Sequence, residues 1–103
     1  MMAEDRNHVV EIFLPLAFGD GEPVPAAIFE LLKQELTEVF GGITAYSRAP
    51  VEGRWKGEQD DLIIFEVMTN KLDKGWWRDF RKRTEALLRQ ERLLIRSTES
   101  TTL

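Results

Sequence analysis

Four segments of the chain alternate between two kinds of side chain with a period of two, which is the pattern of β-strands. The predicted strands are His8 to Leu16, Ile43 to Ala49, Leu62 to Thr69 and Arg92 to Thr98. Leu62 to Thr69 is apolar on both sides except for Glu66, which is typical of a central strand. Pro50 closes the second strand, and the charged stretch from Val51 to Asp61 is predicted to be a long hairpin connection.

Two other segments repeat their apolar residues at the spacing of an amphipathic helix. The first begins at Pro25, which suits the first helical position because its missing N–H costs nothing there, and it ends at Gly41-Gly42. The second follows Asp73, a favourable N-cap. The predicted buried faces are Ile28, Leu31, Leu32, Leu36, Val39 and Phe40 in the first helix, and Trp76, Trp77, Phe80, Thr84, Leu87 and Leu88 in the second.

The resulting order is strand, helix, strand, strand, helix, strand, which predicts an α+β fold of the ferredoxin-like βαββαβ type. Right-handed crossovers give a four-stranded antiparallel sheet in the order 4-1-3-2, with two helices on one face. The other face is left open. We expect residues 1–103 to form a single domain with an ordered core at 8–98 and frayed ends at 1–7 and 99–103.

Composition narrows the possible functions. The 103 residues are 43% hydrophobic and carry a formal charge of −4, with no Cys and one His. Disulfide frameworks, thiolate zinc sites and Cys nucleophiles are therefore excluded, and no metal or cofactor is predicted. The apolar stretch from Val9 to Phe18 is interrupted by Glu11 and Pro15, so we interpret it as a strand and not as a signal peptide. No run approaches the ~20 apolar residues of a membrane helix, which predicts a soluble, cytoplasmic protein.

Three short motifs carry a resemblance to a known group of proteins. They are Phe40-Gly41-Gly42-Ile43-Thr44 at the end of the first helix, Gly53-Arg54-Trp55 in the hairpin and Trp76-Trp77 at the start of the second helix. With them the chain resembles small, mostly uncharacterised bacterial proteins of the ferredoxin-like superfamily, related in architecture to the dimeric α/β-barrel proteins. This resemblance implies that two open sheets face each other in a dimer. It implies no catalytic residue.

Charged residues are predicted on the open face of the sheet. Alternation places Glu11 and Glu66 on the two central strands, Arg96 beside Glu11, and Arg48 with Tyr46 beside Glu66. Two neighbouring carboxylates repel each other and raise one pKa, so this could be a ligand or acid/base site. Alternatively, it is a solvated or interfacial charge ladder, worth about 0.2–1 kcal/mol per favourable pair. Strand register decides between them.

The tryptophans and the basic residues have their own interpretations. Trp76 and Trp77 are adjacent, so one can enter the core while the other lies near a surface, and Trp55 is a candidate for closing over a pocket or a partner. The chain from Lys71 to Arg96 is rich in basic residues. An RNA-recognition module would need aromatic side chains on its central strands, where this chain has a glutamate, so binding of nucleic acid is not expected.

The function predicted from the sequence is that of a homodimer whose facing sheets enclose a small-molecule pocket. An apolar set on the open face supports the dimer: Val9, Phe13, Leu62, Ile64, Met68 and Leu94. The alternative is a non-catalytic self-association or regulatory module without a ligand. Whether any reaction is catalysed stays open. The candidate ligand-binding residues are Glu11, Glu66, Tyr46, Arg48, Arg96 and Trp55.

Overall fold

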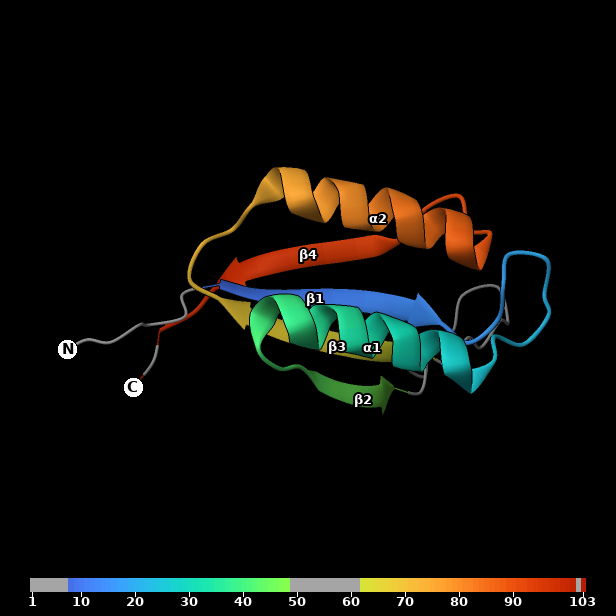
Figure 1. The fold of residues 1–103 in the computed structure, drawn as a ribbon, viewed down its shortest axis with the longest axis horizontal. Helices are drawn as coiled ribbons and strands as arrows, with labels where there is room; N and C mark the ends of the chain where they lie inside the picture. The colour runs from blue at the N-terminus through green and yellow to red at the C-terminus, as the bar shows by residue number, and fades with distance from the viewer. Residues whose placement is uncertain (1–7, 49–61, 102) are drawn as a thin grey trace, which may run out of the picture.

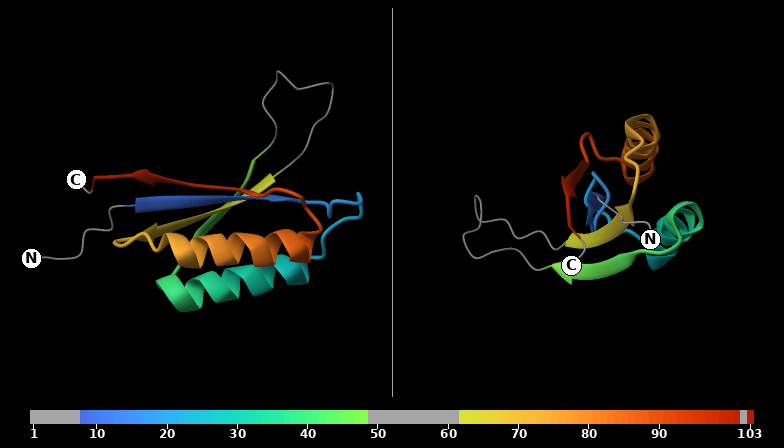
Figure 2. Two further views of the ribbon diagram at one scale, coloured as in Figure 1. Left: turned by 90° about the horizontal axis from the view of Figure 1, so that it is seen from above. Right: turned by 90° about the vertical axis from the view of Figure 1, so that its left-hand side faces the viewer.

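The computed structural model describes residues 8–48, 62–101 and 103, and it confirms the predicted order of elements (Figure 1). The elements are β1 (His8–Pro15), α1 (Ala26–Phe40), β2 (Thr44–Arg48), β3 (Leu62–Thr69), α2 (Lys74–Leu88) and β4 (Leu94–Glu99). The strands form one antiparallel sheet in the order β2-β3-β1-β4, as predicted. Both helices lie on the same face of this sheet, which leaves the opposite face without a helix (Figure 2).

The strand boundaries differ slightly from the predicted ones. β3 has the predicted bounds, whereas β1 ends at Pro15 and leaves Leu16 outside the strand and exposed. β4 starts at Leu94, two residues later than predicted, and continues to Glu99. β2 starts at Thr44, and Ala49 with the predicted hairpin connection lies outside the described residues. None of these shifts changes which residues face the helices.

The core lies between the sheet and the two helices. Among the described residues, the sheet contributes Val10, Ile12, Leu14, Phe65 and Val67, and the helices contribute Phe29, Leu32, Leu36, Trp77, Phe80 and Leu88. These inward positions of β1 and β3 are apolar throughout, as alternation along a strand requires when one face packs on helices. The hydrophobic core is therefore confined to one face of the sheet.

The predicted buried face of α1 is wrong at two positions. Leu31 and Val39 are 60% and 50% exposed, while Phe29, which the prediction omitted, is buried together with Leu32 and Leu36. A helix turns by about 100° per residue, so Leu31 points well away from the direction of its neighbour Leu32. The stripe that packs on the sheet is thus narrower than the apolar pattern suggested.

The N-terminus of α2 forms as predicted. The Asp73 carboxylate accepts a hydrogen bond from the backbone N–H of Trp76 at 3.0 Å, which caps the helix. Trp77 is buried in the core and Trp76 is partly buried against it, with their rings edge to face. The expectation that one tryptophan enters the core is confirmed. Leu87 was predicted to be buried but is exposed.

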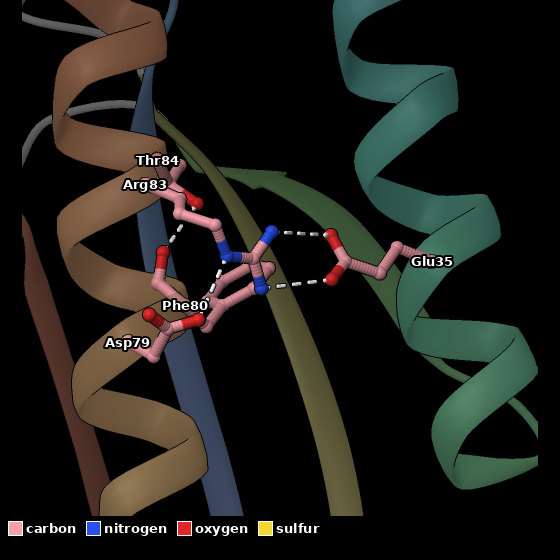
Figure 3. Close-up of polar contacts among 5 residues, drawn as sticks. All are labelled: Glu35, Asp79, Phe80, Arg83 and Thr84. Carbon is pink, nitrogen blue, oxygen red and sulfur yellow. Dashed lines mark hydrogen bonds and ion pairs between the residues drawn. The ribbon is translucent and has the colours of Figure 1, made fainter.

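An ion-pair network joins the two helices across their outer side (Figure 3). Arg83 of α2 donates from Nη2 to Glu35 of α1 at 3.0 Å and from Nε to Asp79 at 2.9 Å. The hydrogen bonds to Glu35 and then Asp79 hold the pKa of Arg83 above its ordinary value. Beside it, the buried Thr84 hydroxyl donates to the Phe80 carbonyl at 2.8 Å. The network fixes the helices to each other and is distant in sequence from every predicted site residue.

The loop after β1 is attached to the end of α2. The Gly19 N–H donates to the Leu88 carbonyl at 3.0 Å, and the Arg89 guanidinium lies 4.2 Å from the centre of the Phe18 ring. Arg89 also forms an ion pair with Asp20. The pKa of Asp20 is lowered mainly by a hydrogen bond from the backbone N–H of Glu22 and, to a smaller extent, by the hydrogen bond from Arg89. This contact closes the end of the core where β1 leaves the sheet.

Candidate functional site

A single row of residues crosses the open face of the sheet from β4 to β2. Glu11 lies directly opposite Arg96 on one side and directly opposite Glu66 on the other. Glu66 in turn lies opposite Thr44. Directly opposed residues bring their Cβ atoms to about 4.5–5.5 Å, so the two carboxylates are immediate neighbours. The predicted adjacency of Glu11, Glu66 and Arg96 is therefore present in the register.

Arg96 and Glu11 form a closed pair. The Arg96 Nε donates to Glu11 Oε1 at 2.9 Å, and its guanidinium carbon lies 5.0 Å from the centre of the Phe13 ring. The Glu11 side chain is 20% exposed and that of Arg96 is 55% exposed. A charge-assisted hydrogen bond and a cation–π contact both favour this geometry. The pair leaves the Glu11 carboxylate neutralised.

Glu66 is the uncompensated charge of the row. Its residue is half-buried, and it makes no hydrogen bond or ion pair with any residue that the structure describes. Its cross-strand neighbours are another carboxylate, already paired, and a threonine. A half-buried carboxylate without a partner loses part of its hydration and gains nothing in return. Such a group is well placed to receive a cation or a hydrogen-bond donor from outside the domain.

Arg48 lies on the strand that flanks Glu66, as predicted, but the register leaves it outside this row. Thr44 stands opposite Glu66, whereas Tyr46 is opposite Ile64 and Arg48 is opposite Leu62. Arg48 is thus four residues along β2 from Thr44, or about 13 Å at the usual rise per residue. Arg48 does not share the row of the two carboxylates. Trp55, the remaining predicted residue, lies outside the described part of the chain.

Apolar side chains surround the row. Phe13 is half-buried, Met68 and Leu94 are exposed, and Ile64, which lies opposite Phe13, has no exposed surface at all. Ile64 was predicted to lie on the open face, and it stands apart from the buried cluster under the helices. The open face is therefore partly closed around the centre of β3 and apolar beside the charges. Such a surface offers apolar side chains for an apolar group to pack on, next to the carboxylate of Glu66.

The described part of the chain shows neither a metal-binding cluster nor a membrane-spanning helix. Within residues 8–48, 62–101 and 103, no three His, Asp or Glu side chains are grouped so that they could hold a metal ion. No helix in those ranges is long and apolar enough to cross a membrane. The row on the open face is thus the candidate site that the register supports.

Comparisons with known proteins define the fold and leave the chemistry open. Neither a protein-family model nor a curated protein matches the chain. Among solved structures, the chain is similar to a phage SAM lyase in complex with S-methyl-5'-thioadenosine, with a TM-score of 0.66. The two share 13% sequence identity, and the match covers 96% of this chain and 85% of the lyase chain. The chain therefore shares the overall fold of that protein, and at this identity the likeness concerns the fold alone.

Sequence reasoning missed Thr44 as the neighbour of Glu66. Nothing in the strand itself marks it, because Thr44, Tyr46 and Arg48 share one alternating set and any of them could stand opposite Glu66. A short connection between β2 and β3 would have fixed the register of the two strands. The connection in this chain is long, so its length leaves the register undetermined.

Proposed function

We propose that this chain binds a small molecule on the open face of its sheet, between copies of itself, with Glu66 as the anionic anchor. The observation that carries the proposal is the half-buried Glu66 carboxylate, which has no partner among the described residues. Its neighbour Glu11 is neutralised by Arg96. The row therefore presents one negative charge in apolar surroundings, which suits a ligand that carries one positive charge on an apolar or aromatic body.

The structural neighbour suggests a class of ligand with that chemistry. The phage protein is named a SAM lyase and holds S-methyl-5'-thioadenosine. S-adenosylmethionine contains a sulfonium cation attached to an adenosine, whose adenine base is flat. S-methyl-5'-thioadenosine is an uncharged thioether of the same nucleoside. A carboxylate attracts the sulfonium, while Phe13 and the aliphatic side chains offer a surface for the nucleoside. We therefore assign adenosyl sulfonium compounds and their thioethers as the ligand class.

Self-association completes the proposed site. Met68 and Leu94 are exposed and Phe13 is half-buried on the same face. A second copy laid on this face would remove the apolar surface from water and would enclose the row of charges. The alternative is a self-association module in which the second copy leaves no room for a ligand, and the closed pair of Arg96 with Glu11 is the observation in its favour.

The ligand is tested by calorimetric titration with S-adenosylmethionine and with S-adenosylhomocysteine, its thioether analogue, which lacks the sulfonium charge. We expect the sulfonium compound to bind more tightly, and Glu66→Gln to weaken its binding by about tenfold, since a charged contact is replaced by a neutral one. The thioether should be affected much less. Glu91→Gln is the matched control, because Glu91 is an exposed glutamate in the turn after α2. Chromatography of the same mixtures reports whether the ligand is chemically changed.

Two results would contradict the ligand proposal. One is that neither compound binds at millimolar concentration, and the other is that Glu66→Gln binds the sulfonium compound as tightly as the unchanged chain does. A dimer that binds neither compound is the result that the self-association module predicts.

Association is tested by sedimentation at micromolar concentrations. We expect the chain to dimerise and Leu94→Glu to weaken the dimer at least tenfold, because it places a charge within the apolar contact. Leu31→Glu is the control, since Leu31 is as exposed as Leu94 but lies on α1, on the other side of the sheet. A chain that sediments as a monomer at 100 micromolar or above, or a dimer insensitive to Leu94→Glu, would refute an interface on the open face.

A further inference from the structure

A hollow lies on the side of the sheet that carries the helices, between α2 and the edge strand β4. Its volume is about 290 Å³, close to the lower end of the range for small-molecule pockets. Leu72, Trp77 and Ile95 supply its apolar wall. β4 is the outermost strand on this side of the sheet, so the hollow is a groove that opens along an edge of the domain.

Three cationic side chains line the groove from one stripe of α2. Lys74, Arg78 and Arg81 follow one another at spacings of four and three residues, which places them on the same face of a helix. Lys74 and Arg78 make no hydrogen bond or ion pair with any described residue. Positive charge therefore gathers at the groove without an internal partner.

Arg81 shows the same deficiency at a buried atom. Its Nε is buried and lacks a hydrogen-bond acceptor within the described residues. The nearest carboxylate oxygen, Glu85 Oε2, lies 3.7 Å away, beyond hydrogen-bond distance, and it accepts instead from the backbone N–H of Leu93 at 2.9 Å. A buried donor without an acceptor costs free energy. The Arg81 side chain as a whole is 39% exposed, so its guanidinium group can still meet an anion in the groove.

The sum of charges at the groove identifies the kind of anion. Arg96 also borders the groove, but Glu11 on the opposite face engages its guanidinium, so it adds no free charge. Three cations and the Glu85 carboxylate leave a charge of about +2, which matches the charge of about −1.5 to −2 on a phosphate monoester. A guanidinium group can also donate two parallel hydrogen bonds to two oxygens of one phosphate.

We propose that this groove binds an organic phosphate, with the phosphate held by Arg78, Arg81 and Lys74 and the organic part packed against Leu72 and Ile95. Apart from Arg96, which borders both, the site is separate from the row on the open face, because the sheet lies between them. It can therefore exist whether or not the open face binds a ligand.

The proposal is tested by nuclear magnetic resonance titration of the full chain with phenyl phosphate, inorganic phosphate and benzyl alcohol. Phenyl phosphate should shift the Arg81 Nε–H signal and the amides of Ile95 and Ser97, and it should bind more tightly than either partial probe. Arg81→Gln and Arg78→Gln should each weaken it by about ten- to a hundredfold, the usual effect of losing a charged hydrogen bond. Lys82→Gln is the control, because Lys82 is an exposed cation of α2 that does not line the groove.

Three results would overturn the proposal. The first is that Lys82→Gln weakens binding as much as Arg78→Gln, which would mean diffuse attraction to a basic helix. The second is that inorganic phosphate binds as tightly as phenyl phosphate, which would remove the role of the apolar wall. The third is that phenyl phosphate shifts no groove signal at millimolar concentration. Arg78→Gln keeps the test valid even where Arg81→Gln prevents folding, because Arg78 is exposed.

Discussion

The two faces of the sheet are built from the same strands but differ in what their side chains do. On the helix-covered face, β1 contributes Val10, Ile12 and Leu14, which are apolar and buried. On the open face, β1 carries Glu11 between Val9 and Phe13, and all three are half-buried. The covered face is sufficient to specify the fold. The charges on the open face lie outside the hydrophobic core, which is why we look for function there.

The same contrast holds for polar contacts. Several polar groups of α2 are paired: Thr84 donates to Phe80, and Arg83 binds both Glu35 and Asp79. On the open face, Glu66 stays without a described partner. Unpaired polar groups in otherwise well-paired structures are candidates for contacts with something outside the chain. The groove at Arg81 fits the same argument.

Removing a large side chain from each face is the strongest test of this comparison. Phe65→Ala on the covered face should lower the free energy of unfolding by about 3–5 kcal/mol, because the ring is fully buried in the core. Phe13→Ala on the open face should cost roughly 1 kcal/mol, since its ring is only half-buried. Urea denaturation at low protein concentration measures both, and equal losses would show that the open face is part of the core.

The sequence predicted the covered face well and the open face only in part. Alternation identified the inward residues, because burial on one face forces a regular pattern, and right-handed crossovers gave the strand order. It could not pair Glu66 with Thr44, because that pairing depends on the length of a connection and not on any side chain. It also missed the cationic groove, since Lys74, Arg78 and Arg81 looked like a solvated helix face until β4 was placed beside them.

A smaller effect is expected where the loop after β1 meets the end of α2. A Cβ atom at Gly19 would overlap the Arg89 carbonyl oxygen, and backbone atoms cannot move aside cheaply. Gly19→Ala should therefore lower the free energy of unfolding by about 1–3 kcal/mol. Gly42→Ala is the control, because a Cβ there meets nothing within 4 Å. If thermal melting shows the same loss of stability for both variants, the contact between the loop and α2 does not contribute to the stability of the fold.

The smallest effect concerns the ion pair of Asp20 with Arg89, which lies at the end of the core on the covered side. It is the counterpart of the pair of Arg96 with Glu11 on the open face. The pKa of Asp20 lies below 3.8, first because the Glu22 N–H donates to it and then because Arg89 does. A lowered carboxyl pKa stabilises the fold fully above 3.8, and this stabilisation is lost as pH falls through the lower, folded value. Asp20→Asn keeps the acceptor for Glu22 but removes the charge, so its stability should fall less than that of the unchanged chain between pH 5 and pH 2.

Carboxyl titration by nuclear magnetic resonance then separates the two causes of the lowered pKa. In Arg89→Gln the hydrogen bond from Glu22 remains, and because this bond is the larger cause, the pKa of Asp20 should rise only part of the way towards 3.8. A full return to 3.8 would mean that the ion pair alone lowers the pKa. No change at all would mean that Arg89, which also lies against the Phe18 ring, contributes nothing to the lowered pKa of Asp20. Because the carboxylate is exposed, salt should weaken the Arg89 part and leave the backbone part in place.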